Sequence, residues 1–257
     1  MTPILHAFLP HDILPGAAKK PLPGIAPADP DDWLRVDAAY AAQMAERERL
    51  LTTRRKEVLQ VLPEAAPAAT ELLDMALTWA AGQGGFARDG SRVTRPDGVT
   101  VTIKVSDPLG TLGRLFQQDL CILERRGDEH ALTAAVLCFP ASWTLSEKIG
   151  RPLTAIHRPV APYSPDIARR VQRLFDGVRP GRPIWRANAL GYDSPALFHP
   201  CREGVPHEAQ ADAGFLRCER QVILRLPATN AVVFTIHTHV VARENLTPAQ
   251  VRAMAEG

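Results

Sequence analysis

The sequence has few cysteines and no cysteine cluster. Its 257 residues contain four cysteines, at positions 121, 138, 201 and 218, and no two of them form a C-x-x-C pair. Zinc ribbons and cysteine-ligated iron–sulfur clusters need closely spaced thiolates, so neither is supported here. Widely separated cysteines fit a reducing compartment in which the thiols stay free.

Long apolar runs and blocks of one charge are also missing. No stretch approaches the roughly 18 consecutive apolar residues of a membrane span. The opening MTPILHAFLPHDILPG lacks the basic region and the cleavage site of a secretory signal. The net charge is only +2 and the arginines are scattered, which gives no footprint for a polyanion. We therefore expect a soluble cytoplasmic protein with no nucleic-acid partner and no membrane partner.

Nucleotide-binding motifs are absent as well. The segment GQGGFA at 82–87 has the form G-x-G-x-x-A, but it follows an expected helix and leads into RDGSR. A dinucleotide loop should follow a strand and open a helix, because the pyrophosphate binds at the helix N-terminus. No P-loop and no G-x-S-x-G elbow occurs either. We expect no nucleotide site on this chain.

The first half of the chain is expected to be helical. Seven prolines in residues 1–30 exclude a continuous helix there and indicate an arm that wraps over the surface. A helix is predicted from Asp31 or Asp32 as cap to Pro63, because apolar residues recur near helical spacing. A second helix is predicted over 67–81, with Thr70 as candidate N-cap and Gly82 as stop.

The second half changes to a mainly β pattern. SRVTRPDGVTVTIKV alternates β-branched and polar residues around the turn RPDG, which predicts a hairpin. The further predicted elements are helices over 111–125 and 164–178, strands over 130–140 and 182–192, and a hairpin of 215–227 with 231–241 around ATN. The pattern as a whole predicts the α+β class, with helices first and then an antiparallel sheet with inserted helices.

The HTH segment in the last predicted strand is a candidate metal site. Residues i and i+2 of a strand point to the same face, so His237 and His239 can approach one ion together. No third ligand at a fixed spacing is visible. Two hydrogen-bonded histidines on a sheet face remain the alternative, and a non-haem metal enzyme is one hypothesis for the function.

His157 lies in a segment that restricts its backbone. Pro152 and Pro159 flank it, and Ile156 indicates an apolar wall beside the imidazole. A restrained, half-buried imidazole suits axial ligation of haem iron, where the second ring nitrogen needs a fixed hydrogen-bond partner. The residues alone leave two alternatives open, a hydrogen-bonded loop histidine and an iron ligand.

Several blocks in the same order resemble one known family. These blocks are LCFPASWTLSEKIGRPLTAIHRPVAPY, RPGRPIWRANALGYDSPALFHP and RCERQVILRLPATNAVVFTIHTHV. They resemble the haem-dependent oxidative N-demethylases, the haem-bearing subunit of bacterial dimethylamine monooxygenases. The resemblance covers roughly residues 30 to 242.

The resemblance implies a PAS-like fold, a curved antiparallel sheet with inserted helices that holds one haem b. It divides the chain into an N-terminal arm and helical segment (1–90), a PAS-like haem-binding domain (91–245) and a C-terminal tail (246–257). The implied enzyme is a monooxygenase that dealkylates a small amine with dioxygen. Its electrons come from NADPH through FMN and an iron–sulfur cluster on separate reductase subunits.

The resemblance also implies roles for particular residues. His157 is the expected axial ligand and the one expected metal-binding residue. Arg186 and Asn188 are expected at the haem edge or the oxygen side, where a guanidinium can pair with a propionate or donate to dioxygen. Arg220 is expected to serve a second propionate, with its neighbour Glu219 on the opposite face by strand alternation.

This chain departs from the family pattern at two places. Ala189 and Leu190 follow WRAN where the family usually has a Trp, and His237 and His239 replace an Arg and a Tyr. His237 is therefore added to the candidate catalytic residues, and His239 to those that bind the cofactor. Iron ligation by either histidine in place of His157 stays open, as does a PAS-like haem sensor without turnover.

Overall fold

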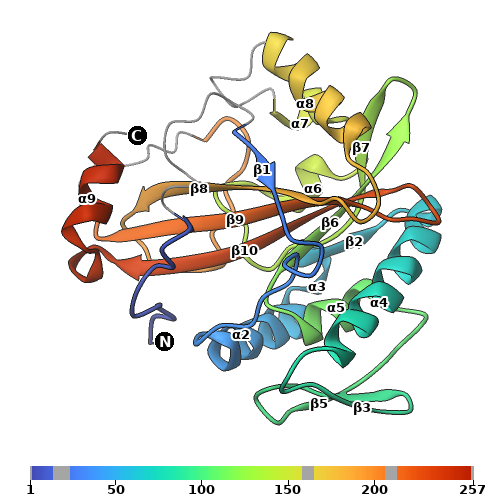
Figure 1. Ribbon diagram of the computed structural model, residues 1–257, viewed down its shortest axis with the longest axis horizontal. Coiled ribbons are helices and arrows are strands. Elements are labelled where there is room, and N and C mark those ends of the chain that lie inside the picture. The colour runs from blue at the N-terminus through green and yellow to red at the C-terminus, as the bar shows by residue number, and fades with distance from the viewer. Residues whose placement is uncertain (1, 14–23, 158–164, 206–212, 256–257) are drawn as a thin grey trace.

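A seven-stranded antiparallel sheet forms the centre of the protein. The computed structural model describes residues 2–13, 24–157, 165–205 and 213–255. The strand order of the sheet is β1-β8-β9-β10-β6-β7-β2 (Figure 1). The strands are β1 (Ala26–Pro27), β2 (Leu59–Val61), β6 (Asp119–Arg126), β7 (Glu129–Val136), β8 (Ile184–Tyr192), β9 (Phe215–Arg225) and β10 (Val232–Ala242).

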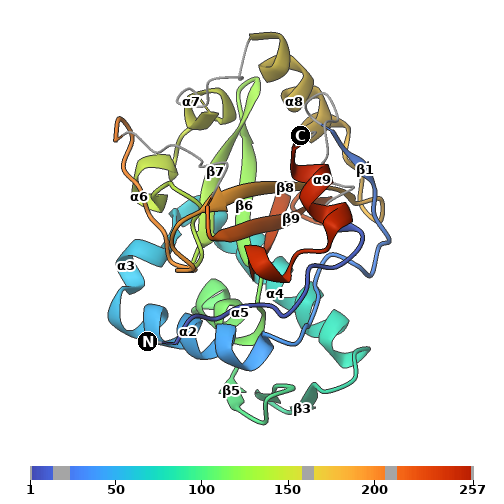
Figure 2. The ribbon, with the colours of Figure 1, turned by 90° about the vertical axis from the view of Figure 1, so that its left-hand side faces the viewer.

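Helices cover both faces of this sheet. One layer consists of α2 (Tyr40–Thr53), α3 (Arg55–Val58), α4 (Ala66–Ala81) and α5 (Pro108–Leu115). The other consists of α6 (Leu145–Lys148), α7 (Leu153–His157) and α8 (Pro165–Gly177) (Figures 1 and 2). We call the two sides the α2–α5 face and the α6–α8 face. The remaining elements are η1 (Pro63–Ala65), η2 (Arg243–Asn245), α9 (Pro248–Ala255) and a small sheet of β3 (Ala87–Asp89), β4 (Arg92–Thr94) and β5 (Thr100–Thr102).

Alternation along the strands assigns each side chain to one face. In β9, Val222 and Leu224 belong to the apolar cluster under α4 and α5, whereas Ile223 between them belongs to the cluster with Leu153 and Phe175. Successive side chains of a strand point to opposite faces, so strand register decides which polar residues can meet. This register is used below to place the candidate site residues.

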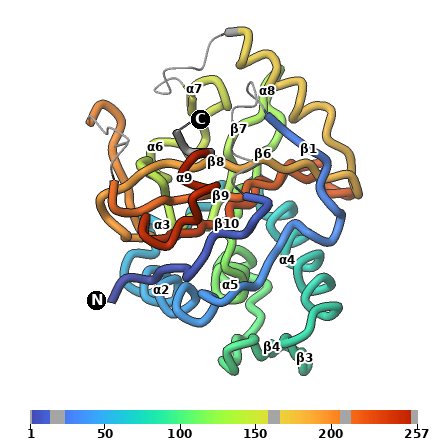
Figure 3. The backbone as a smooth tube through the Cα atoms, turned by 60° about the vertical axis from the view of Figure 1, so that its left-hand side comes forward, coloured from blue at the N-terminus to red at the C-terminus, as the bar shows by residue number. Residues whose placement is uncertain are grey.

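The chain order of the central strands is simple. The hairpin β6–β7 comes first, α6, α7 and α8 follow, and β8, β9 and β10 then complete the sheet. The last strand, β10, lies between β6 and β9 and pairs antiparallel with both. The N-terminal segment runs beside β10, where the His6 amide donates to the Val240 carbonyl at 2.7 Å (Figure 3).

The mixed α+β class and the hairpins are confirmed. β4 and β5 pair around Gly98, which has the left-handed φ of +81° that the turn needs. β9 and β10 pair along their whole length, and the Leu226 amide closes their turn on the Ala231 carbonyl at 2.9 Å. Gly82 is the C-cap of α4, as predicted.

Three predicted helices have wrong boundaries. The first long helix begins at Tyr40 and ends at Thr53, and Thr70 lies inside α4, where its hydroxyl donates to the Ala66 carbonyl. The segment 111–125 is helical only to Leu115 and then becomes β6. The apolar residues that suggested a continuing helix instead pair with β7 and β10, so tertiary pairing outweighs local spacing there.

A buried ion pair joins α2 to the sheet. Arg47 and Asp119 are both fully buried, and Nη1 of Arg47 donates to the Asp119 carboxylate at 2.6 Å. The same carboxylate accepts the backbone amides of Cys138 and Phe139 at 2.7 and 2.8 Å. It thereby fixes the chain where it leaves β7 toward α6. All four cysteines are free thiols.

Among the helices of the described segments, none combines the length and the apolar character required to cross a membrane.

Candidate functional site

The predicted site residues lie on two opposite faces of the sheet. Directly paired residues of antiparallel strands share a face. Arg186 pairs with Gln221, and Asn188 pairs with Glu219, on the α6–α8 face. Arg220 pairs with His237 on the α2–α5 face.

His239 lies on the same face as His237, two residues further along β10. Glu219 and Arg220 point to opposite sides, as strand alternation predicted. A single flat macrocycle on one face therefore cannot contact both groups of residues. The two groups are described separately.

His157 is the last residue of α7, on the α6–α8 side. Its Nδ1 lies 2.9 Å from the carbonyl oxygen of Leu153, one helical turn earlier. A carbonyl only accepts, so Nδ1 carries the proton and the lone pair is on Nε2. Burial is the main effect on the pKa of His157 and lowers it. The hydrogen bond with Leu153 raises this pKa, and the positive charges of Lys148 and Arg186 lower it, so that the net shift is downward. The imidazole is therefore neutral near pH 7, the form that binds metals.

Lys148 holds this end of α7 in place. Its ammonium donates to the carbonyl oxygen of Ile156 at 2.8 Å and pairs with Glu203 at 2.6 Å. The Lys148 side chain is buried, so both contacts are shielded from solvent. They tie the turn before His157 to the loop that carries Glu203.

Arg186 lies in β8 with little compensation for its charge. Within the described segments it makes no ion pair, and its buried Nε has no hydrogen-bond partner. Burial lowers the pKa of Arg186, partly offset by the charge of Glu219. Thr238 Oγ1 and Arg217 Nε, on the same face by register, are also buried without partners in the described segments. Buried donors without acceptors are the groups that an anionic ligand satisfies.

Asn188 and Glu219 hold each other across the strands. The Asn188 amide donates to the Glu219 carboxylate at 3.3 Å, and the Glu219 backbone amide donates back to Asn188 Oδ1 at 3.2 Å. Gln221 and Arg217 also contact this carboxylate, at 3.0 and 3.5 Å. Asn188 is thus oriented by a polar network beside Arg186.

Arg220 already has a partner on the α2–α5 face. Its guanidinium pairs with Asp32 at 2.7 Å and lies 5.1 Å from the centre of the Trp185 ring. Burial, together with the nearby Arg35, lowers the pKa of Arg220 to about 10. This environment is separated by the sheet from that of Arg186.

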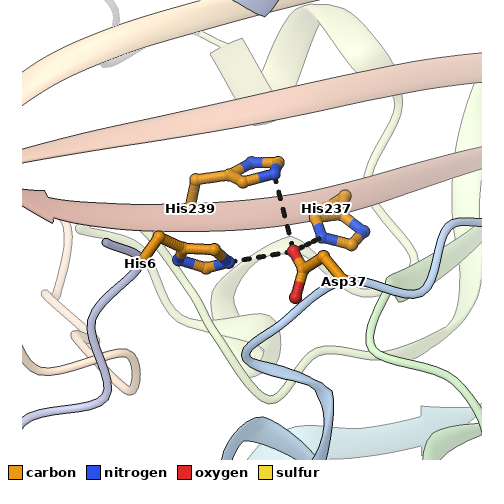
Figure 4. Close-up of side chains that lie close together, drawn as sticks. All are labelled: His6, Asp37, His237 and His239. Carbon is orange, nitrogen blue, oxygen red and sulfur yellow. Dashed lines mark hydrogen bonds and ion pairs between the residues drawn. The ribbon is translucent and has the colours of Figure 1, made fainter. Parts of the chain in front are cut away.

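His237 and His239 form a compact cluster with two residues from the N-terminal region. Figure 4 shows His6, Asp37, His237 and His239 with their polar atoms directed toward one another. The Asp37 Oδ2 atom lies 2.9 Å from His6 Nε2, 2.7 Å from His237 Nε2 and 3.6 Å from His239 Nε2. The four potential ligand atoms all lie within 4.8 Å of one another.

The protonation states of the cluster follow from its burial. The three histidines are 2–6% exposed, and Asp37 is 22% exposed. Burial raises the pKa of Asp37, but the hydrogen bonds from His237 and His6 lower it well below its usual value. Burial lowers the pKa of His237 and, more strongly, that of His239. An ionised carboxylate therefore faces the neutral imidazoles of His237 and His239.

Glutamine side chains surround the cluster. Gln117 donates to Asp37 Oδ1 at 2.9 Å, and the Ala39 amide donates to the same oxygen at 2.9 Å. Gln118 donates to His237 Nδ1, and His239 Nδ1 is buried with no hydrogen-bond partner in the described segments. These contacts fix the Asp37 carboxylate and the His237 ring, but they leave His239 Nδ1 without a hydrogen bond in the described segments.

An acidic pocket leads to the cluster. It has a volume of about 670 Å³, and His237 and His239 line its inner end. Asp29, Asp31 and Asp32 line it as well. No local pattern pointed to the partners His6 and Asp37, since they lie 231 and 200 positions before His237 and at no fixed spacing from it. The fold alone brings these side chains together.

Comparison with known protein families gives one match. Residues 24–256 match the family described as haem-dependent oxidative N-demethylase, alpha subunit-like. That description denotes a haem-dependent oxidoreductase, and "alpha subunit-like" implies that other subunits exist in the family. The match covers nearly all of the central sheet and both helical layers, and so the chain belongs to the haem-dependent oxidative N-demethylase, alpha subunit-like family.

Proposed function

We propose that the protein is a haem-dependent monooxygenase that removes an alkyl group from a small amine. The proposal places haem b on the α6–α8 face, between α7 and the strands β8 and β9. One observation carries it. The half-buried Arg186, whose buried Nε has no hydrogen-bond partner and which makes no ion pair within the described segments, shares this face with His157, whose proton is fixed on Nδ1.

The residues present fit this cofactor. Haem brings two carboxylates, and the α6–α8 face offers donors that lack acceptors at Arg186, Arg217 and Thr238. It also brings an iron that takes a neutral imidazole, and His157 is neutral with its lone pair on Nε2. The α2–α5 face fits less well. Arg220 has a buried Nε with no partner in the described segments, but its guanidinium already pairs with Asp32, whereas Arg186 makes no ion pair there.

The order of elements supports the PAS-like core that the resemblance implies. Of the five strands β6–β10, two precede the inserted helices and three follow, and the last of them, β10, pairs with the first, β6. The inserted helices α6–α8 cover one face of this sheet (Figure 2). The proposed ligand and the guanidinium then come from a helix and a strand on the same side of the sheet.

In this arrangement His157 would hold the haem iron. The Leu153 carbonyl keeps its ring orientation, and the bonds of Lys148 to Ile156 and Glu203 keep the turn in place. A fixed partner on the second ring nitrogen also increases the basicity of the ligating nitrogen.

Arg186 neutralises a propionate or donates to the oxygen side. Either role gives the buried guanidinium the acceptor it lacks. Asn188, held by Glu219, is the neighbouring polar group that can orient a substrate amine. Glu219 supplies a carboxylate of opposite charge to a protonated amine on the same face.

When bound, haem supplies the activation of dioxygen that no amino-acid side chain provides. In the net reaction, dioxygen, two electrons, two protons and an N-methylated amine give the dealkylated amine, formaldehyde and water. The electrons come from a nicotinamide cofactor through flavin and iron–sulfur groups on separate reductase subunits. The chain itself has no nucleotide motif and no cysteine cluster to carry them.

Turnover with a reductase tests the proposal. Haem-loaded protein, a flavin–iron–sulfur reductase and NADPH are mixed with mono-, di- and trimethylated amines, and oxygen uptake and formaldehyde are measured. We expect amine-dependent oxygen uptake with one formaldehyde for each dioxygen consumed. Arg186→Met should lower the rate, whereas the exposed Arg182→Met should not.

A haem protein that is reduced but never consumes oxygen with any of these amines would contradict the enzyme hypothesis. That result would favour the PAS-like haem sensor. Protein that binds no haem at all would contradict both.

A further inference from the structure

We propose that His6, Asp37, His237 and His239 form a binding site for a divalent transition-metal ion, separate from the proposed haem site. The cluster lies on the α2–α5 face, and the sheet separates it from Arg186 and Asn188. The donor set is three imidazoles and one carboxylate, which suits Zn²⁺ or a similar first-row ion.

The geometry is close to that of a metal site. A tetrahedral ion with ligand distances of about 2.0–2.2 Å holds its ligand atoms about 3.3–3.6 Å apart. Asp37 Oδ2 is 2.9, 2.7 and 3.6 Å from the Nε2 atoms of His6, His237 and His239. The four ligand atoms lie within 4.8 Å of one another, so side-chain shifts of roughly 1 Å convert the hydrogen-bonded cluster into a coordination sphere.

The surroundings of the cluster also suit a cation. A pocket of about 670 Å³ reaches His237 and His239, so an ion has a route to the ligands. Three aspartates and one arginine line this pocket, namely Asp29, Asp31, Asp32 and Arg35, and Arg35 pairs with Asp32. The carboxylates of Asp29 and Asp31 favour the approach of a cation.

Proton positions decide which ligands bind best. Without an ion, His6 and His237 donate Nε2–H to Asp37, so ligation requires each proton to move to Nδ1. At His237, Gln118 Oε1 has no hydrogen-bond partner in the described segments and can accept that proton when the amide turns over. His239 Nδ1 likewise lacks a partner there, so either nitrogen of this ring can carry the proton.

His6 is the weakest of the four ligands. The Val240 amide donates to its Nδ1 at 3.3 Å, which opposes a proton at that nitrogen. Asp37, His237 and His239 therefore form the core of the site, and His6 completes it. An ion held this way links the N-terminal segment, the turn before α2 and strand β10.

Titration with Co²⁺ and Zn²⁺ tests the site. Tag-free, haem-loaded protein is stripped with a chelator and titrated with Co²⁺, and the visible d–d bands of four- or five-coordinate cobalt are recorded. We expect one Co²⁺ per chain, displaced by one Zn²⁺, with a higher melting temperature and an unchanged Soret band. Haem-free protein should bind the same ion, so this result does not depend on the proposed function.

Matched variants locate the ion. Asp37→Asn, His237→Gln and His239→Asn should each weaken binding by about a hundredfold or more, and Gln118→Leu by about tenfold, as for a residue that orients a ligand. The exposed His11→Asn should bind as the wild type does. Circular dichroism verifies that each variant is folded.

Two results would overturn the proposal. One is the absence of stoichiometric binding to the wild-type protein at millimolar Co²⁺ or Zn²⁺. The other is binding that survives in the folded Asp37 and His239 variants. Either would leave the cluster as a hydrogen-bonded connection between the N-terminal segment and β10.

Discussion

The buried pair of Arg47 and Asp119 makes a quantitative prediction about stability. Asp119→Asn keeps the shape of the side chain but removes the charge that compensates Arg47, which is fully buried. Breaking a buried ion pair by removing one partner costs about 3–5 kcal/mol of unfolding free energy. Domains of ordinary stability have about 5–15 kcal/mol in total, so the loss is large.

The contacts of Asp119 explain why the cost belongs in this range. The carboxylate accepts Arg47 at 2.6 Å and the amides of Cys138 and Phe139 at 2.7 and 2.8 Å. An amide in its place has one oxygen rather than two, so at least one of these buried donors loses its acceptor. For a chain of this size, each kcal/mol lowers the melting temperature by about 2–4 °C, which gives a decrease of about 6–20 °C.

Urea unfolding followed by circular dichroism measures this loss. The control is Glu57→Gln, which breaks an exposed pair with Arg54 and should change the unfolding free energy by about 0.5 kcal/mol or less. The reasoning is refuted if Asp119→Asn costs no more than this control. In that case the ion pair would not be what holds α2 to the sheet.

Three further predictions concern the faces of the sheet. Burial lowers the pKa of His237 and His239 below that of an unfolded histidine, which is about 6.5. Below this pH the unfolded state binds more protons than the folded state, so the free energy of unfolding decreases by up to about 1.4 kcal/mol per pH unit for each histidine. Urea unfolding in metal-free buffer should show this decrease, and stability that stays constant from pH 7.5 to 5.5 would contradict it. Gly113→Ala should cost about 1–3 kcal/mol by thermal unfolding, because the added Cβ would lie 2.7 Å from Val136 Cγ2; an unchanged melting temperature would show that the core yields there. Arg186→Met should weaken haem affinity by about ten- to a hundredfold in a haem-transfer assay, because it removes one charge-assisted hydrogen bond to a propionate. If the variant binds haem as tightly as the wild type does, the propionates lie elsewhere.

Local sequence signals were sufficient for the last hairpin. Residues 215–225 and 232–242 are rich in residues that favour strands, and Asn230 takes the left-handed conformation that the tight turn between them needs. Alternation also placed Glu219 and Arg220 on opposite faces. Helix stops at Gly82 and Gly177 were likewise encoded by a few adjacent residues.

The start of the first helix was not predictable from local pattern. Trp33 is buried in the core beside the sheet, although it lies in an irregular segment before α2. Its spacing from Tyr40 and Met44 imitated a helical face, but tertiary packing rather than helix formation buries it. The strand β6 was hidden for a similar reason, since a short apolar run fits a helix as well as a buried strand.

The candidate sites show the same limit more clearly. Whether Arg186 and Arg220 lie on the same face of the sheet depends on the register of β8 against β9, which no local pattern encodes. His6 and Asp37 join His237 only because the N-terminal segment and the turn before α2 both pack against β10. Contacts between residues so far apart in the sequence come from the fold.

The most direct test of the central claim is the identity of the axial ligand. Haem-loaded wild-type protein and the variants His157→Gly and His239→Asn are compared by absorption and electron paramagnetic resonance spectra, with and without added imidazole. The account predicts that His157→Gly loses the histidine-ligated spectrum and that imidazole restores it, while His239→Asn keeps the wild-type spectrum. A wild-type spectrum in His157→Gly, together with its loss in His239→Asn, would move the haem to the other face of the sheet and contradict the account.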